Sequence, residues 1–130
     1  MVRLGVETTS KALRRLARRD GPDAGRVARA LSRLTAAAPD PSDSRTKTMM
    51  AFMYLRLNRY QEAIRPLEDV LAGAVGEKNL SFVLALAYVG AGDEGNAVRV
   101  LRWTAGLPED RVRTEVETLG REVRRRGPRR

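Results

Sequence analysis

The chain has 130 residues, with 25 Lys and Arg against 16 Asp and Glu, and it contains no His and no Cys. This length suits one domain of ordinary size. The absence of Cys excludes disulfides, thiolate metal sites and thiol nucleophiles, and the absence of His excludes imidazole bases and imidazole metal ligands. We therefore expect a binding protein with no cofactor and no metal, and not an enzyme.

The net charge of +9 suggests an acidic partner, a nucleic acid or an anionic membrane surface. The charge is unevenly placed, because residues 1–43 carry +4, residues 44–110 carry 0 and residues 111–130 carry +5. The basic excess therefore belongs to the two ends. The longest apolar run, from Phe82 to Val89, is too short to span a bilayer, and the first residues lack a secretory signal. We expect a cytoplasmic protein with no membrane span.

In chain order, the first two expected elements are short helices. Apolar residues from Leu13 to Ala17 predict a helix that Gly21 and Pro22 close. A second helix is predicted from Val27 to about Ala38, before Pro39 and Pro41. Its apolar positions are Val27, Ala30, Leu31, Leu34, Ala37 and Ala38.

The next part of the sequence repeats itself, because segment 47–72 aligns without gaps with segment 81–106. Tyr54 recurs as Tyr88, and Ala63 recurs as Ala97. The other matched pairs are Met50 with Leu84, Ala51 with Ala85, Asn58 with Gly92, Ile64 with Val98, Arg65 with Arg99 and Leu67 with Leu101. The offset between the two segments is the period of about 34 residues that is typical of one class of helix–turn–helix repeat.

Each copy predicts two helices with a turn between them. Asn58 and Gly92 end the first helices, at positions suited to a left-handed backbone, and Gly73 and Gly106 stop the second ones. Pro66 lies inside the second helix of the first copy, so we expect a kink or a late helix start there.

One more helix is predicted after the repeats, with Pro108 just inside its start and Gly127 after its end. Its apolar stripe consists of Val112, Val116, Leu119 and Val123. We expect Trp103 to pack against this terminal helix. The prediction is thus an all-α chain of seven helices with no strand.

The repeated pattern resembles the tetratricopeptide repeat (TPR). It occurs as Ala51, Tyr54, Asn58, Tyr60, Ala63 and Leu67, and again as Ala85, Tyr88, Gly92, Ala97 and Leu101. Lys47 and Ser81 stand where the family has Trp, and the closing Pro is replaced by Val75 or displaced to Pro108. The resemblance implies a solenoid of helical hairpins in one domain over residues 1–126, with repeats at about 10–43, 44–77 and 78–111, a capping helix at 109–126 and a basic tail at 127–130.

A small TPR domain of about three repeats is similar to the chaperones of bacterial type III secretion. This resemblance implies a cytoplasmic chaperone that holds an apolar or amphipathic helix of a needle or translocator subunit, together with a co-chaperone. The alternatives are a nucleic-acid-associated protein that acts through its basic flanks and a self-associating scaffold, so a homo-oligomer is also an expectation.

The family places its ligands on the concave face, which the first helix of each repeat lines. The corresponding positions here are Arg45, Thr48, Phe52, Leu55, Arg56, Asn79, Phe82, Leu86, Val89 and Gly90. We expect Phe52, Leu55, Arg56, Phe82, Leu86 and Val89 to bind the partner, with Arg14 and Arg18 extending the groove. An apolar groove facing water indicates a partner. Alternatively, an N-terminal segment with Val2, Leu4 and Val6 or a second copy of the chain covers it.

Two further motifs have structural interpretations. Gly90, Gly92 and Gly95 form a G-x-G-x-x-G pattern, but no strand precedes it, so we expect helix termination and close packing instead of nucleotide binding. The acid pairs at 93–94 and 109–110 are interpreted as helix-start residues. The basic end, Arg124 to Arg130, is interpreted as a solvated terminus in preference to a nucleic-acid contact.

Overall fold

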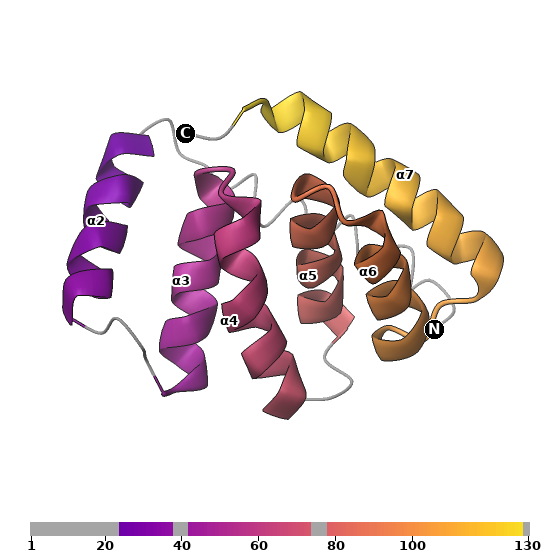
Figure 1. Ribbon diagram of the computed structural model, residues 1–130, viewed down its shortest axis with the longest axis horizontal. Coiled ribbons are helices and arrows are strands. Elements are labelled where there is room, and N and C mark those ends of the chain that lie inside the picture. Colours follow the sequence, from indigo (N-terminus) through magenta and orange to yellow (C-terminus); the bar gives the residue numbers. More distant parts are fainter. Residues whose placement is uncertain (1–23, 38–41, 74–77, 129–130) are drawn as a thin grey trace.

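The computed structural model describes residues 24–37, 42–73 and 78–128, and all the regular structure in these ranges is helical (Figure 1). The elements are α2 (Ala24–Ala37), α3 (Ser44–Arg56), α4 (Tyr60–Gly73), α5 (Lys78–Gly90), α6 (Glu94–Arg99), the π-helical segment η1 (Val100–Thr104) and α7 (Glu109–Arg126). The all-α prediction is confirmed. The helix expected around residues 13–17 lies outside the described residues.

Two hairpins, α3–α4 and α5–α6, contain the same turn. Asn58 and Gly92 have positive φ angles of 57° and 83°, as the sequence predicted. The Arg59 amide donates to the Tyr54 carbonyl at 2.8 Å, and the Asp93 amide donates to the Tyr88 carbonyl at 2.8 Å. Because these bonds join equivalent positions of the two copies, the internal repeat is present in the backbone as well as in the sequence.

The main hydrophobic core surrounds α5. Every residue of α5 from Ser81 to Tyr88 is buried, and α5 packs against α4, α6, η1 and α7. Helix α7 runs from the α6 side of the molecule across α5 toward the α3–α4 turn (Figure 1). Its buried Val112 and Leu119 belong to this core. A helix that is apolar all round requires such cover on several sides.

A smaller cluster attaches α2 to α3. Val27 and Leu31 of α2 pack against Met50 and Leu57, and no other helix joins this cluster within the described residues. Helix α2 therefore stands at the edge of the molecule, as Figure 1 shows. Its attachment buries fewer apolar side chains than the main core does.

Two prolines differ from their expected roles. Helix α4 begins at Tyr60 and continues through Pro66 to Gly73, so the late helix start predicted at Pro66 is wrong. The buried Ala63 and Leu67 on either side of Pro66 bind this helix to the core, which offsets the hydrogen bond that proline cannot donate. Pro108 precedes α7 as its N-terminal cap residue instead of lying inside the helix.

At Gly90 the α5–α6 hairpin lies close against the α3–α4 hairpin. A Cβ atom at this position would overlap the ring of Tyr60, which is itself buried at the start of α4. The close packing expected of the glycine pattern is thereby confirmed at Gly90, and the expected helix termination is confirmed at Gly92.

We predict that Gly90→Ala lowers the free energy of unfolding by about 1–3 kcal/mol, because the added methyl group overpacks the contact with Tyr60. Urea denaturation monitored by circular dichroism measures this change. The matched control is Gly73→Ala, since a Cβ there meets nothing within 4 Å. Equal stability of the two variants would contradict the close approach.

Candidate functional site

The predicted groove is not open at its centre. Leu55, Phe82 and Leu86 are each at most 1% exposed and belong to the main core. The prediction that these three side chains face a partner is therefore wrong for the described structure. The reason is tertiary, because the terminal helix α7 packs over α5 and the two clear repeats share one core.

The other predicted contact residues differ in exposure. Phe52 and Val89 are half-buried at the margin of the main core. Arg56 is also half-buried, and its Nε atom has no hydrogen-bond partner among the described residues. Arg14 and Arg18 lie outside the described residues. The remaining candidate surface is therefore the outer face of α3.

The outer face of α3 carries a hollow of about 620 Å³. Its lining residues are Ser44, Arg45, Thr48, Met49 and Phe52. Met49 is 46% exposed, which makes it one of two large apolar side chains exposed to this degree in the described ranges. Arg45, Thr48 and Phe52 were predicted from the repeat positions, whereas Met49 was missed. The signal was present, because Met49 follows Arg45 by four residues and precedes Phe52 by three, so all three share one helix face.

The start of α3 is fixed by its cap. Asp43 accepts hydrogen bonds from the Thr46 amide at 3.0 Å and from the Thr46 hydroxyl at 2.8 Å. These bonds stabilise the ionised carboxylate and lower the pKa of Asp43 below its ordinary value. The cap places the first turn of α3, which carries Ser44 and Arg45, at the edge of the hollow.

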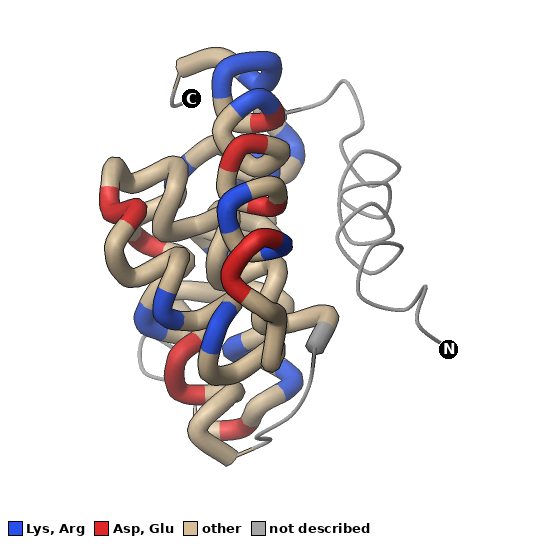
Figure 2. Tube along the Cα trace, turned by 90° about the vertical axis from the view of Figure 1, so that its right-hand side faces the viewer, with Lys and Arg blue, Asp and Glu red and all other residues tan. Residues whose placement is uncertain are grey.

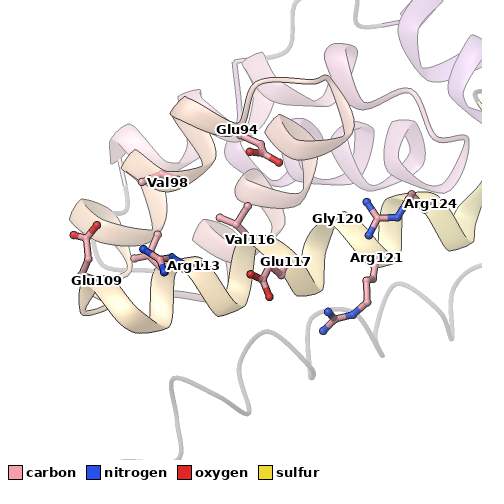
Figure 3. Close-up of a pocket in the computed structure, with 10 residues that line it drawn as sticks. Glu94, Val98, Glu109, Arg113, Val116, Glu117, Gly120, Arg121 and Arg124 are labelled. Carbon is pink, nitrogen blue, oxygen red and sulfur yellow. The ribbon is translucent and has the colours of Figure 1, made fainter.

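A second concave surface, the α6–α7 groove, has a volume of about 600 Å³ (Figure 3). Its lining residues are Glu94 and Val98 from α6, and Glu109, Val112, Arg113, Val116, Glu117, Gly120, Arg121 and Arg124 from α7. The α7 members follow one another at helical spacing, so they form a single stripe. From the sequence, Val112 and Val116 were expected only to pack against the repeats, and this groove was missed.

The charges of α7 alternate along the helix, and basic residues gather at its C-terminal end (Figure 2). Outside the groove several of them are paired, since Arg111 contacts Glu115 at 2.8 Å and Arg125 contacts Glu122 at 2.6 Å. Among the described residues that line the groove, only Glu109 has an ion-pair partner, which is Arg102 at 2.7 Å. The groove thus combines valine side chains with charges of both signs.

Trp103 does not pack against α7 as expected. It is 74% exposed and protrudes from the segment η1. The buried residue of this segment is Leu101, and Trp103 lies two residues further along, roughly half a turn around the helix. The core position is therefore occupied by Leu101, and Trp103 faces outward.

The acid pairs are helix-start residues, as predicted. Asp93 caps α6 by accepting a hydrogen bond from the Asn96 amide at 3.2 Å, and Glu94 begins the helix. Glu109 and Asp110 form the first turn of α7. A separate acidic contact occurs at the edge of the core, where the hydroxyl of the buried Tyr88 donates to the exposed Glu68. Burial, together with this bond to Glu68, raises the pKa of Tyr88.

The basic end of the chain is not a wholly solvated terminus. The Arg126 side chain is only 4% exposed, and it donates to the Asn58 Oδ1 atom at 3.1 Å and to the Leu55 carbonyl at 2.8 Å. The side-chain Nδ2 atom of Asn58 donates to the carbonyl oxygens of Arg126 and of Pro128, both at 3.1 Å. Arg126 therefore caps the C-terminal end of α3, and Asn58 caps the C-terminal end of α7. We name this contact between Asn58 and Arg126 the clasp.

No protein-family model, curated protein or solved structure matches the chain significantly. None of the helices in residues 24–37, 42–73 and 78–128 is both long and apolar enough to cross a bilayer. In the same part of the chain, no cluster of three carboxylates is arranged to hold a metal ion.

We predict that Arg126→Met lowers the free energy of unfolding by about 1–3 kcal/mol, because it leaves buried acceptors without donors. Asn58→Gly is the partner variant, since glycine accepts the positive φ angle while removing the amide. In a double-mutant cycle, the two losses are expected to be non-additive by about 0.5–3 kcal/mol. Additive losses in urea denaturation would contradict the clasp. Arg65→Met is the control, because the Arg65 side chain is 85% exposed on α4 and lies outside the clasp.

Proposed function

We propose that the chain is a protein-binding module of TPR-type helical hairpins, which holds one amphipathic helix of a partner against the outer face of α3. The hollow beside Met49 and Phe52 is the observation that carries this proposal. It lies on a helix where the family resemblance puts the ligand. Apolar side chains three residues apart are suited to contact a docked helix.

The repeat type is supported by two observations. The hydrogen bonds of the α3–α4 turn recur at the equivalent positions of the α5–α6 turn. In addition, Asn58 and Gly92 adopt the left-handed backbone that the repeat pattern requires at these positions. One helical hairpin in each period of about 34 residues is the organisation of this family.

The residues that line the hollow on α3 indicate which kind of ligand would fit it. Met49 is flexible and polarisable, so it adapts to apolar side chains of different shapes. Arg45 lies on the same helix face and adds a positive charge. The preferred ligand is therefore a helix with an apolar stripe and a carboxylate beside it.

The resemblance to small secretion chaperones gives this proposal a narrower form. In that form the bound helix belongs to a needle or translocator subunit that otherwise assembles with its own kind in the cytoplasm. Binding to α3 masks the apolar stripe, and release occurs at the export machinery. No catalytic step is part of this function.

The clasp favours protein binding over nucleic-acid binding through the basic end. It engages Arg126, and Glu122 pairs with Arg125. Each cation that is already paired contributes less to phosphate binding. The hollow on α3, in contrast, has an exposed apolar side chain that no described residue covers.

Site-specific photo-cross-linking tests the proposed ligand face. A photoreactive amino acid at Met49 is expected to capture a partner protein in cells of the source organism. The same group at Arg65 is the control, because the Arg65 side chain is 85% exposed on α4 and lies outside the hollow. Mass spectrometry identifies the cross-linked segment, which is expected to be an amphipathic helix. Equal cross-linking from both positions would count against the α3 face.

With the captured segment as a synthetic peptide, Met49→Glu is expected to weaken binding by about tenfold or more in calorimetry, whereas Arg65→Glu leaves it unchanged. A buried carboxylate in the hollow opposes an apolar ligand. Leu86→Glu does not test the site, because Leu86 is fully buried and its replacement disrupts the core. Undiminished affinity of the Met49 variant, with helicity retained, would refute this location.

A further inference from the structure

We infer that the α6–α7 groove binds α7 of a second copy of this chain, so that two copies associate through antiparallel α7 helices. This interface differs from the hollow on α3 in all of its residues. Association through α7 and ligand binding on α3 can therefore be tested separately.

The position of α7 provides the first argument. In the described residues, α3 pairs with α4 and α5 pairs with α6, whereas α7 packs on α5, α6 and η1 and leaves Glu117 and Arg121 exposed. Its outer side forms the stripe that borders the groove (Figure 3). The groove has valines at its base and charged groups at its rim, which fits a helix with mixed charge.

Charges without ion-pair partners provide the second argument. Glu94, Arg113, Glu117, Arg121 and Arg124 line the groove and form no ion pair with any described residue. Elsewhere on α7, Arg111, Glu115, Glu122 and Arg125 are all in ion pairs. A partner with both signs of charge in the opposite order satisfies such a surface. In a second copy of α7, read antiparallel, Arg121 precedes Glu117, so these two charges meet their opposites.

We choose the register of the pair so that Glu117 meets the partner's Arg121. A twofold axis beside Leu119 places Glu117 of each copy opposite the partner's Arg121, and it does so twice in the dimer. In Figure 3, the Arg121 side chain extends from α7 on the side away from α6. The same axis places Gly120 next to the point where the two helices cross.

Gly120 provides the third argument, because it lines the groove, whereas Gly73 and Gly95, which also have no positive φ angle and no close contact for an added Cβ, do not. Gly90 is required by the ring of Tyr60, and Gly92, Gly106 and Gly127 have positive φ angles. A Cβ at Gly120 would only approach the Arg124 guanidinium at 3.5 Å, which is an ordinary contact. Glycine destabilises a helix interior relative to alanine. Its missing side chain permits a second helix to come close.

Charge reversal with complementation tests the interface in the full chain. Sedimentation equilibrium from about 1 to 100 μM, a range that brackets dimers of moderate affinity, is expected to give twice the chain mass of 14.4 kDa. Glu117→Arg and Arg121→Glu are each expected to weaken the dimer by about tenfold or more, because each places like charges opposite each other. An equimolar mixture of the two variants restores opposite charges in both pairs and is expected to restore the dimer.

Two control variants distinguish this interface from a general effect of charge or of stability. Arg65→Glu makes the same kind of charge change on α4 and is expected to leave the dimer intact. Gly120→Ala is expected to raise the thermal midpoint of the diluted monomer, because alanine favours a helix, and to weaken the dimer, because the methyl group occupies the crossing point. A Gly120 variant that loses both stability and association would contradict a role at the interface.

Three results would overturn the inference. The wild-type chain remains a monomer throughout the concentration range, both single variants dimerise like the wild type, or their mixture fails to recover association. A chain lacking residues 1–23 is measured alongside. If it dimerises while the full chain does not, the N-terminal segment and not a second copy occupies the groove.

Discussion

The burial of α5 on every side is the constraint that organises the molecule. Its residues from Ser81 to Tyr88 expose almost no surface, and only a helix surrounded by other helices satisfies that pattern. Helix α4 covers one side, α6 with η1 a second, and α7 a third. The burial of Phe82 and Leu86, the path of α7 and the placement of the remaining grooves all follow from this requirement.

Helix α7 has a buried apolar face and an exposed charged face. Val112 and Leu119 join the core, whereas Glu117 and Arg121 face outward with no ion-pair partner among the described residues. A capping helix needs only a polar outer face. Here the outer face also borders a groove with valine at its base, which is more than solubility requires. The surfaces available for recognition are therefore the exposed faces of α3 and of α7.

Local chemistry could be predicted from the sequence, and long-range packing could not. Asn58, Gly92 and the helix-start acids were assigned correctly because turns and caps depend on neighbouring residues. Leu55 and Phe82 were assigned to an open groove because helical periodicity identifies a face without saying what covers it. The outward position of Trp103 was within reach, since the buried Leu101 already defines the opposite side of the helix. No signal in the sequence pairs Arg126 with Asn58.

The clasp changes what kind of folding unit the chain is. In an array of repeats that contact only their neighbours, stability is approximately a sum of the stabilities of single repeats and of the interfaces between neighbouring repeats. Here Asn58 and Arg126 are 68 residues apart in sequence, and their contact joins the α3–α4 hairpin to the last helix. Closing a loop of this length has an entropic cost that the clasp and the core must offset together. We therefore expect loss of the C-terminal turn to destabilise the α3–α4 hairpin, and the described helices from α3 to α7 to unfold as one cooperative unit.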